Sequence, residues 1–249
     1  DKINNIFNAK GNVEVNNKIE NYKINSENIT YFKNQEKITS KGKTTSLIQS
    51  KYYFSSKDVT FDILEKTLSS NFNTRVKDSE ANLFILDKFK YLINSETLKG
   101  ENIIIITQNG KPESDKYYFS NAIIDLKNNN FLGKDPKIYV HKNIFDNTQN
   151  DPRLYGSSSI KKGKITTITN GIFTSCKIQK GKCPPWKIRA KKIKHDKEKK
   201  QLIYDHAVLE LYDVPIFYYP KFFHPDPTVT KQSGFLQPRL NNSKILGSS

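Results

Sequence analysis

The sequence lacks any long apolar run, and this absence excludes one class of protein. No stretch of about 18 consecutive apolar residues occurs, so no transmembrane helix is expected. Hydrophobic residues make up only 35% of the chain, although aromatic residues alone make up 12%. Globular domains usually contain about 45–50% apolar residues. The composition therefore favours a thin or open β structure over a thick globular core.

Catalytic motifs are also missing. No Ser-centred elbow, Gly-rich phosphate loop or carboxylate pair stands out. His195 and Asp196 resemble a catalytic pair, but neighbours on a strand point to opposite faces, and we expect Asp196 to bond local backbone in a turn. A zinc site built from Cys176, Cys183, His195 and His206 fits no ligand spacing. We therefore predict no enzyme activity, no metal and no cofactor.

Targeting signals are absent as well. The chain begins at Asp1 with no charged-then-apolar leader, so we expect that any signal peptide has been removed or left out of this sequence. It ends in Gly-Ser-Ser, which we interpret as a cut within a larger protein.

Period-two alternation of apolar residues predicts strands throughout. It is seen at Val13 with Val15, Ile29 with Tyr31, Val59 with Phe61, and Ile124 with Leu126. Residues 62–70 and 78–92 are the only plausible helical intervals, and strand is favoured for the second. Ile193 falls out of phase with the preceding residues, which indicates a bulge near Lys191 and Lys192. Residues 147–159 are interpreted as a long loop.

Short steps recur every 14 to 17 residues in the first sixty. Each has a small residue, a charge, a turn-tolerant residue and usually a β-branched one. The steps are 9–13, 26–29, 40–43 and 56–59, with later echoes at 95–98, 120–123 and 190–193. Repeats this short indicate stacked β rungs or hairpins. We predict an elongated all-β fold of about a dozen or more strands.

Positive charge is concentrated in one part of the chain. The net charge is +16, and residues 161–200 contain fourteen Lys or Arg against two carboxylates. Such a field attracts polyanions. The stretch is either a solvated face, a surface that meets phosphates of a glycolipid or membrane, or a nucleic-acid site. The last is least favoured, because only Phe173 and Trp186 interleave with the charges.

Four motifs in the last third resemble one known family. They are Gly171–Cys176, a lone Trp186 followed by Ile193–Asp196, Asp213–Pro220 (DVPIFYYP) and Lys231–Pro238 (KQSGFLQP). In this order they resemble the LptD (OstA) family of lipopolysaccharide-assembly outer-membrane proteins. The repeats in residues 5–65 look like that family's OstA-type repeats. Residues 65–165 are similar to the family only in general sequence character and contain none of its motifs.

The resemblance implies a twisted, open, V-shaped antiparallel β-jellyroll in the periplasm over residues 1–225. Residues 226–249 would be a linker and the start of an outer-membrane barrel that attaches the domain to the membrane. The domain would receive lipopolysaccharide from a periplasmic bridge protein paired with its N-terminal edge strand, within residues 5–20. Acyl chains would slide along an apolar groove into the barrel, which has a lipoprotein partner. No nucleic-acid partner is expected.

Specific residues follow from alternation and from this resemblance. The lipid groove is predicted to contain Val13, Val15, Ile29, Tyr31, Val59, Phe61, Ile124, Leu126, Ile188, Leu209 and Leu211. The barrel junction is predicted at Pro215, Phe217, Tyr219, Pro220, Ser233, Gly234 and Phe235. Anionic headgroups are assigned to Lys187, Arg189 and Lys191.

The two cysteines leave three alternatives open. Gly181 and the Pro184–Pro185 pair favour a turn, so that Cys176 and Cys183 would close a local disulfide. Cys176 also matches the family position for a bridge to the barrel. Two free thiols are the third possibility.

Two rival functions fit part of the sequence. A β-helix enzyme acting on acidic polysaccharide would suit the repeats and the charge, but no carboxylates cluster on one strand face. The second rival function is binding without catalysis, by a polysaccharide-binding protein or by an adhesin or scaffold that binds polyanions.

Overall fold

The computed structural model of the chain describes residues 5–111, 114–140, 150–178, 184–226 and 229, with short stretches at 242–243 and 247–248. In these residues nearly all regular structure is antiparallel β, so the all-β prediction is confirmed. The first strands are β1 (Ile6–Asn17), β2 (Tyr22–Phe32), β3 (Lys37–Ile48), β4 (Tyr52–Lys57), β5 (Thr60–Asp62), β6 (Thr67–Ser70), β7 (Thr74–Lys77), β8 (Leu83–Leu86), β9 (Lys88–Leu92) and β10 (Thr97–Ile106). The remaining strands are β11 (Lys116–Asp125), β12 (Asn130–Lys134), β13 (Lys137–Tyr139), β14 (Asn150–Tyr155), β15 (Ser158–Lys162), β16 (Ile165–Cys176), β17 (Trp186–Asp196), β18 (Gln201–Leu211), β19 (Val214–Pro225), β20 (Asn242–Ser243) and β21 (Gly247–Ser248). A 3-10 helix, η1 (Lys33–Gln35), joins β2 to β3.

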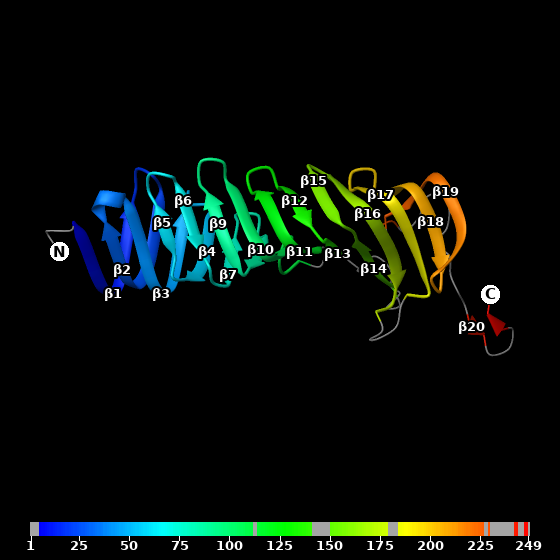
Figure 1. Cartoon of the computed structure of the whole chain (residues 1–249), viewed down its shortest axis with the longest axis horizontal. Coiled ribbons are helices and arrows are strands. Elements are labelled where there is room, and N and C mark those ends of the chain that lie inside the picture. Colours follow the sequence, from blue (N-terminus) through cyan, green and yellow to red (C-terminus); the bar gives the residue numbers. More distant parts are fainter. Residues whose placement is uncertain are drawn as a thin grey trace.

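The strands β1 to β19 form one meander whose members are bent in the middle. Figure 1 shows them following one another along the long axis, from β1 at one end to β19 at the other. Each long strand crosses the full width of the sheet. Elsewhere two short strands lie end to end beside a long one and together cover the same width. β3, for example, pairs with β4 through one half and with β5 through the other. β10 does the same with β8 and β9.

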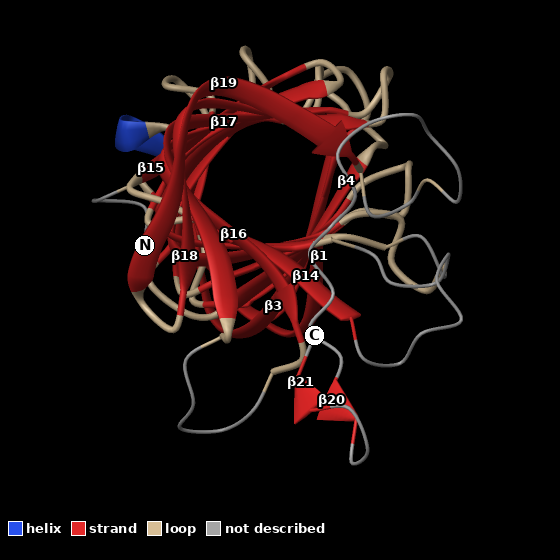
Figure 2. Cartoon of the chain, turned by 90° about the vertical axis from the view of Figure 1, so that its right-hand side faces the viewer, coloured by secondary structure: helices blue, strands red, loops and turns tan. Residues whose placement is uncertain are grey.

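The bend divides the meander into two facing arms. Arm A contains β5, β6, β9, β12 and β15, and arm B contains β4, β7, β8, β13 and β14; each long strand contributes one half to each arm. Viewed end-on, the strands surround a common interior (Figure 2). We call the line of bends the crease, the opposite line where the turns of both arms meet the mouth, and the interior between them the slot.

Aromatic side chains from the two arms pack against one another inside the slot. Phe54 of arm B lies 5.4 Å from Phe89 and 5.2 Å from Tyr91 of arm A, measured between ring centroids. Tyr117 of arm B lies 5.4 Å from Phe131 of arm A. Pairs at this spacing add to the free energy already gained by burial. The groove expected from the sequence is therefore filled by its own side chains in this structure.

Small residues line the crease, because the two arms approach most closely there. One cross-strand row runs through Gly100, Ala122, Gly133 and Ser159. A second row joins Gly171, Ala190 and Ala207. In the first strands the same position is filled by buried hydroxyl residues, namely Ser26, Ser40, Thr44, Ser56, Ser70 and Thr74.

The hydroxyl groups at the crease replace hydrogen bonds that the bend disrupts. Ser40 Oγ donates to the Val59 carbonyl at 3.2 Å and accepts from the Val59 N–H at 2.8 Å. Ser70 Oγ donates to the Lys57 carbonyl at 2.6 Å. Buried backbone groups need such partners, and Ser and Thr supply them over short distances.

The sequence steps in the first sixty residues mark this crease. Asn12, Gly42 and Asp58 are each the turn-tolerant residue of a step, and each has a positive φ within or between bent strands. Asn, Asp and Gly adopt this left-handed region at the least cost. The small residue of three steps is a buried crease serine. The repeat was thus correctly detected, but its steps lie at the crease, within long strands or between two short ones, and not in the turns at the mouth.

Other sequence predictions can be compared with the strands directly. The predicted bulge near Lys191 is wrong, because the registers of β17 with β16 and β18 continue across this residue without a shift. The change of inward phase there comes from the bend at the crease, where the neighbouring strands carry a residue with positive φ. Strand over 78–92 is confirmed from Leu83 onward. The predicted loop over 147–159 is wrong from Asn150, where β14 and β15 form; the Gly156 and Ser157 that suggested a loop connect these two strands at the crease. β19 ends at Pro225, and most of the predicted linker at 226–249 lies outside the described residues.

Candidate functional site

The slot contains every residue predicted for the lipid groove. Six of them are buried, namely Ile29, Val59, Phe61, Ile124, Leu126 and Ile188. The other five, Val13, Val15, Tyr31, Leu209 and Leu211, are partly buried and pack against the same cluster. The alternation therefore identified the inward face of each of these strands, including those whose register was uncertain from sequence.

The slot reaches both ends of the meander, where its side chains become exposed. Phe7 shares the inward face of β1 with Tyr31 of β2, and it remains 59% exposed. At the other end, Phe217 on β19 pairs with Leu209 on β18 and remains 56% exposed. Each end strand has one paired edge in the described residues, β1 with β2 and β19 with β18. Among the described residues no further strand pairs with the other edge of either, and an apolar row ends there with exposed side chains.

Polar side chains join the arms along the mouth, and we call this row of contacts the seam. Lys66 of arm A forms an ion pair with Glu20 of arm B. The hydroxyl of Tyr52 in arm B donates to Glu96 Oε2 of arm A at 2.5 Å.

The seam continues toward the C-terminal end. Asn129 Nδ2 of arm A donates to Glu80 Oε2 of arm B at 2.8 Å, and Lys197 of arm A forms an ion pair with Asp115 of arm B. The contacts join turns that lie 44 to 82 residues apart. The seam thus closes the mouth over the apolar slot.

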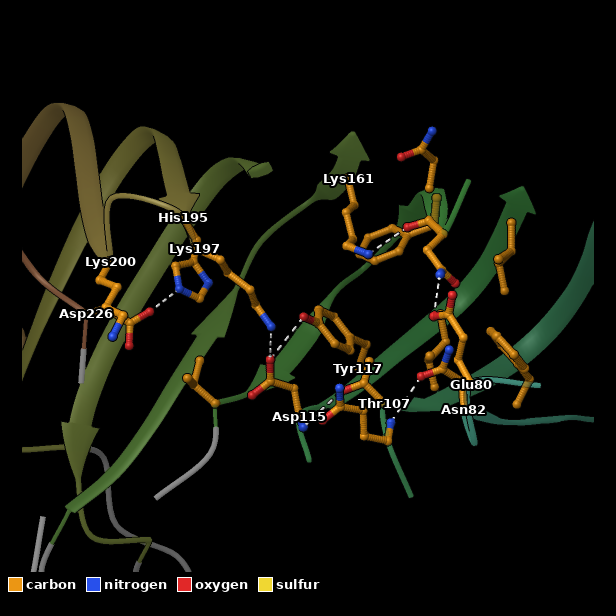
Figure 3. A pocket seen from close by; sticks show the side chains of 18 residues that line it. Glu80, Asn82, Thr107, Asp115, Tyr117, Lys161, His195, Lys197, Lys200 and Asp226 are labelled. Atoms are coloured by element: carbon orange, nitrogen blue, oxygen red, sulfur yellow. Dashed lines mark hydrogen bonds and ion pairs between the residues drawn. The ribbon is translucent and has the colours of Figure 1, made fainter. Parts of the chain in front are cut away.

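A cavity of about 490 Å³ interrupts the seam between its last two contacts. Glu80, Asn129, Asp115 and Lys197 all line it, so the cavity lies where both arms meet (Figure 3). Its deeper walls are apolar and consist of Phe84, Ile105, Ile124, Phe131 and Val140. Lys161 and Lys200 stand at its rim with Lys197. The cavity therefore connects a charged rim, where these lysines lie with the carboxylates of Glu80, Asp115 and Asp226, to the apolar slot.

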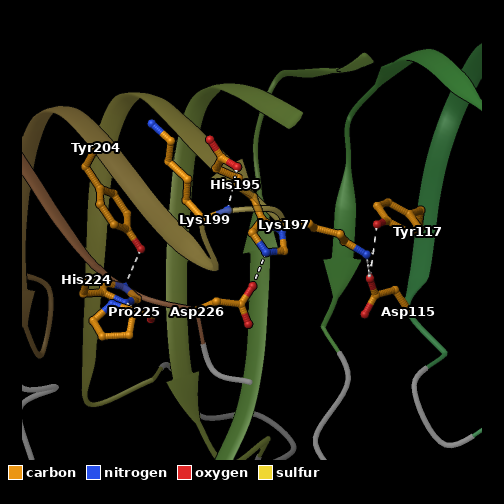
Figure 4. Close-up of polar contacts among 10 residues, drawn as sticks. Asp115, Tyr117, His195, Lys197, Lys199, Tyr204, His224, Pro225 and Asp226 are labelled. Atoms are coloured by element: carbon orange, nitrogen blue, oxygen red, sulfur yellow. Dashed lines mark hydrogen bonds and ion pairs between the residues drawn. The ribbon is translucent and has the colours of Figure 1, made fainter. Parts of the chain in front are cut away.

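The charges at the cavity influence one another strongly. The Tyr117 hydroxyl donates to Asp115 Oδ2 at 3.3 Å, beside the ion pair of Asp115 with Lys197 (Figure 4). Burial would lower the pKa of Lys197, but Tyr117 and Asp115 outweigh it, so the pKa lies above its ordinary value. Burial, and then the charge of Lys197, lower the pKa of Lys161. The two ammonium groups are therefore close enough to repel one another.

A histidine pair lies beside the cavity. His195 contacts Asp226, and the His224 ring accepts from the Tyr204 hydroxyl through Nε2 at 2.7 Å (Figure 4). Nδ1 of His224 donates to the Pro225 carbonyl at 2.6 Å. A neutral imidazole satisfies both contacts of His224. Asp196 accepts from the Lys199 N–H at 3.1 Å, which confirms its predicted role in a turn.

The protein is expected to lose stability in mild acid through His224. Burial lowers its pKa from 6.5 to about 4, although the Pro225 carbonyl and Asp226 act in the opposite direction. The unfolded chain therefore takes up a proton before the folded one, and this contribution is complete above pH 6.5 and lost as the pH falls toward 4. We expect a loss of about 3 kcal/mol in the free energy of unfolding between about pH 7 and pH 4.

Urea unfolding of the protein and of His224→Leu at both pH values isolates this term. The variant should be less stable at neutral pH, but the difference between the two proteins should shrink by that amount in acid. A constant difference would show that His224 titrates equally in both states.

The predicted headgroup residues are partly neutralised by their neighbours. Lys187 Nζ lies 3.3 Å from Glu210 Oε2 and also pairs with Asp213. Arg189 Nε lies 3.0 Å from Glu210 Oε1. The hydrogen bond with Asp213 raises the pKa of Lys187 despite its partial burial. Of the three predicted residues, Lys191 is exposed and the other two already have carboxylate partners.

The predicted barrel junction is partly within the described chain. Pro215, Phe217, Tyr219 and Pro220 lie on β19, where Tyr219 packs against the slot and Phe217 ends it. Ser233, Gly234 and Phe235 lie outside the described residues. Cys176 ends β16 with its thiol 3.7 Å from the Trp186 carbonyl oxygen, whereas Cys183 is outside the described residues, so their pairing stays a prediction.

Sequence reasoning missed the seam and the cavity. Lys161, Lys197 and Lys200 belong to the basic stretch that the sequence singled out, but the Asn129 carbonyl oxygen that Lys161 contacts and the Asp115 that Lys197 contacts lie in distant turns. The concentration of positive charge in the sequence pointed to these lysines, but it did not indicate which residues face them.

The chain matches none of the known family models, and no curated protein matches it. In the part of the chain that the structure describes, no helix is long and apolar enough to cross a membrane. Across the same residues, no three His, Cys, Asp or Glu side chains are grouped so as to hold a metal ion.

Proposed function

We propose that this chain is a periplasmic lipid-transport domain, which guides lipopolysaccharide along its slot toward an outer-membrane barrel. The observation that carries the proposal is the slot itself. Its apolar face runs without interruption from β1 to β19 and is left exposed at both end strands, at Phe7 and Phe217. A carrier needs such a path, because acyl chains must enter at one end and leave at the other.

The energetics favour passive guidance. Removing one CH₂ group from water contributes about 0.8 kcal/mol, so burying an acyl chain of a dozen carbons contributes roughly 10 kcal/mol. The free energy needed to separate the arms is subtracted from this gain. No chemical step is needed to hold such a ligand. The domain is therefore a conduit, and not an enzyme.

The partners in this proposal occupy the two ends. A periplasmic bridge protein adds a strand to the edge of β1 that faces away from β2 and continues the apolar row past Phe7. The exposed aromatic residues of β19 lie toward the barrel, whose lipoprotein partner completes the assembly. The motifs between Gly171 and Pro238, which resemble those of the LptD family, support the same arrangement.

Photocrosslinking from paired tyrosines tests the proposal. Tyr219 faces the slot and Tyr218, its neighbour on β19, is 56% exposed on the outer face. Tyr31 and the exposed Tyr53 form a similar pair near the other end. Each tyrosine is replaced in turn by the photoreactive benzoylphenylalanine, and purified lipopolysaccharide is added before irradiation.

We expect crosslinks from positions 31 and 219 and none from positions 53 and 218. Crosslinks from the outer positions alone would contradict transport through the slot. They would favour the rival function, a surface that binds acidic polysaccharide.

A further inference from the structure

The cavity in the seam combines two chemistries that a single amphiphile would match. Its walls come from both arms, with the turn residues Glu80 and Gln108 on one side and Asn129 and Lys200 on the other. The deeper part is apolar and continues into the slot through Ile105 and Ile124. Its volume of about 490 Å³ lies within the range of small-ligand sites, about 300–1,000 Å³.

Three lysines and three carboxylates line the cavity, and among the described residues Lys161 and Lys200 are the lysines without an ion pair, so an acidic ligand group would bind beside them. Lys161 Nζ donates to the Asn129 carbonyl oxygen at 2.6 Å, and an ammonium has three N–H groups to donate. Burial and the charge of Lys197 both lower its pKa, which means that its charge is held there at a cost in free energy. An anion between Lys161 and its neighbours would offset this cost and accept charge-assisted hydrogen bonds.

The outer face offers a weaker alternative. Lys187 and Arg189, which lie in the same basic stretch, already contact Glu210. Lys191 and Lys192 are exposed and do not line the cavity. None of these four side chains lines the cavity that leads into the slot.

We propose that the cavity binds the acidic headgroup of an amphiphile, a phosphate or carboxylate, at Lys161 and Lys200 while its acyl chain lies on Phe84, Ile105 and Ile124. This inference rests on the proposed function and names a particular place for the headgroup. In this proposal the gap in the seam is a side entrance to the slot. The ligand is held there before or during its passage along the slot.

Direct titration with two fluorescent ligands tests the headgroup site. cis-Parinaric acid has an acyl chain with a carboxylate, and its methyl ester has the same chain without the charge. In Lys161→Gln/Lys200→Gln we expect affinity for the acid to fall about tenfold or more, as for loss of charged hydrogen bonds. Affinity for the ester should change less than about twofold. Lys197 is left in place, because its loss would strand Asp115.

Matched variants separate the site from overall charge. Lys162→Gln/Lys192→Gln removes the same charge from the same basic stretch, at two exposed residues that do not line the cavity, and should bind both ligands as the unaltered protein does. Lys161→Arg/Lys200→Arg keeps the charges and should restore affinity for the acid. Circular dichroism and the unfolding midpoint verify that each variant is folded.

Competition distinguishes the source of the acid. Dodecyl phosphate and dodecanoate are each used to displace cis-parinaric acid, and the tighter competitor identifies the preferred headgroup. Equal losses for acid and ester, or an equal loss in Lys162→Gln/Lys192→Gln, would overturn the headgroup site while leaving the slot as a carrier. Failure of the unaltered protein to bind either ligand would overturn the proposed function as well.

Discussion

Gly133→Val is expected to lower the free energy of unfolding by about 3 kcal/mol, because the crease has no space for a side chain there. A Cβ at this position would lie 2.2 Å from Cδ1 and 2.5 Å from Cε1 of Phe119. Phe119 is itself buried, and its ring packs against Phe131 at 5.0 Å between centroids. The ring has no free volume into which to turn, so either it or the bend of β12 must shift.

Urea unfolding of a double-mutant cycle with Phe119→Ala checks the mechanism. Phe119→Ala alone should cost about 3–5 kcal/mol through the cavity that it leaves. If the ring is the obstacle, the double variant should be clearly more stable than the sum of the two single changes predicts. Leu132→Val serves as the control, since Leu132 precedes Gly133 and is 49% exposed. Simple additivity would mean that the bend itself, and not the ring, determines the cost.

The crease also shows how much of the fold was accessible from sequence. Alternation at Val59 with Phe61, and at Ile124 with Leu126, correctly indicated strands and their inward faces, because side-chain direction has a strict period of two. The steps at residues 40–43 and 56–59 were equally visible. Their position at the crease was not visible, because a residue with positive φ can form either a tight turn or a bend in the sheet.

The candidate site was predictable only on its apolar side. The inward residues form one face by local geometry, so each strand reveals its share independently. The seam contacts join residues 44 to 82 positions apart, such as Tyr52 with Glu96 and Asp115 with Lys197. Which turns face one another depends on how far the bent sheet twists over several strands. No local sequence pattern specifies this accumulated twist, so the cavity could not be predicted from the sequence.

Crosslinking the two arms at the seam is expected to prevent uptake of acyl chains almost completely. The slot is filled by side chains such as Phe54, Phe61 and Leu98, which are less than 2% exposed. A ligand therefore needs the arms to separate, and the seam is where they are joined. Two double variants are made, Glu20→Cys with Lys66→Cys and Glu80→Cys with Asn129→Cys. Both also carry Cys176→Ser and Cys183→Ser. Each pair is joined by a bismaleimide whose spacer contains a cleavable disulfide.

Uptake is measured with cis-parinaric acid before and after reduction of the spacer. We expect at least a tenfold loss of binding in the joined proteins and full recovery once the spacer is cleaved. Glu14→Cys with Lys23→Cys is the matched control, because those two side chains meet at 2.7 Å between neighbouring strands of arm B and do not span the mouth. Undiminished uptake by the joined proteins would show that chains thread in from the exposed ends at Phe7 and Phe217, and that the seam stays closed throughout. The same measurement therefore distinguishes a slot that opens along its length from one that is filled from its ends.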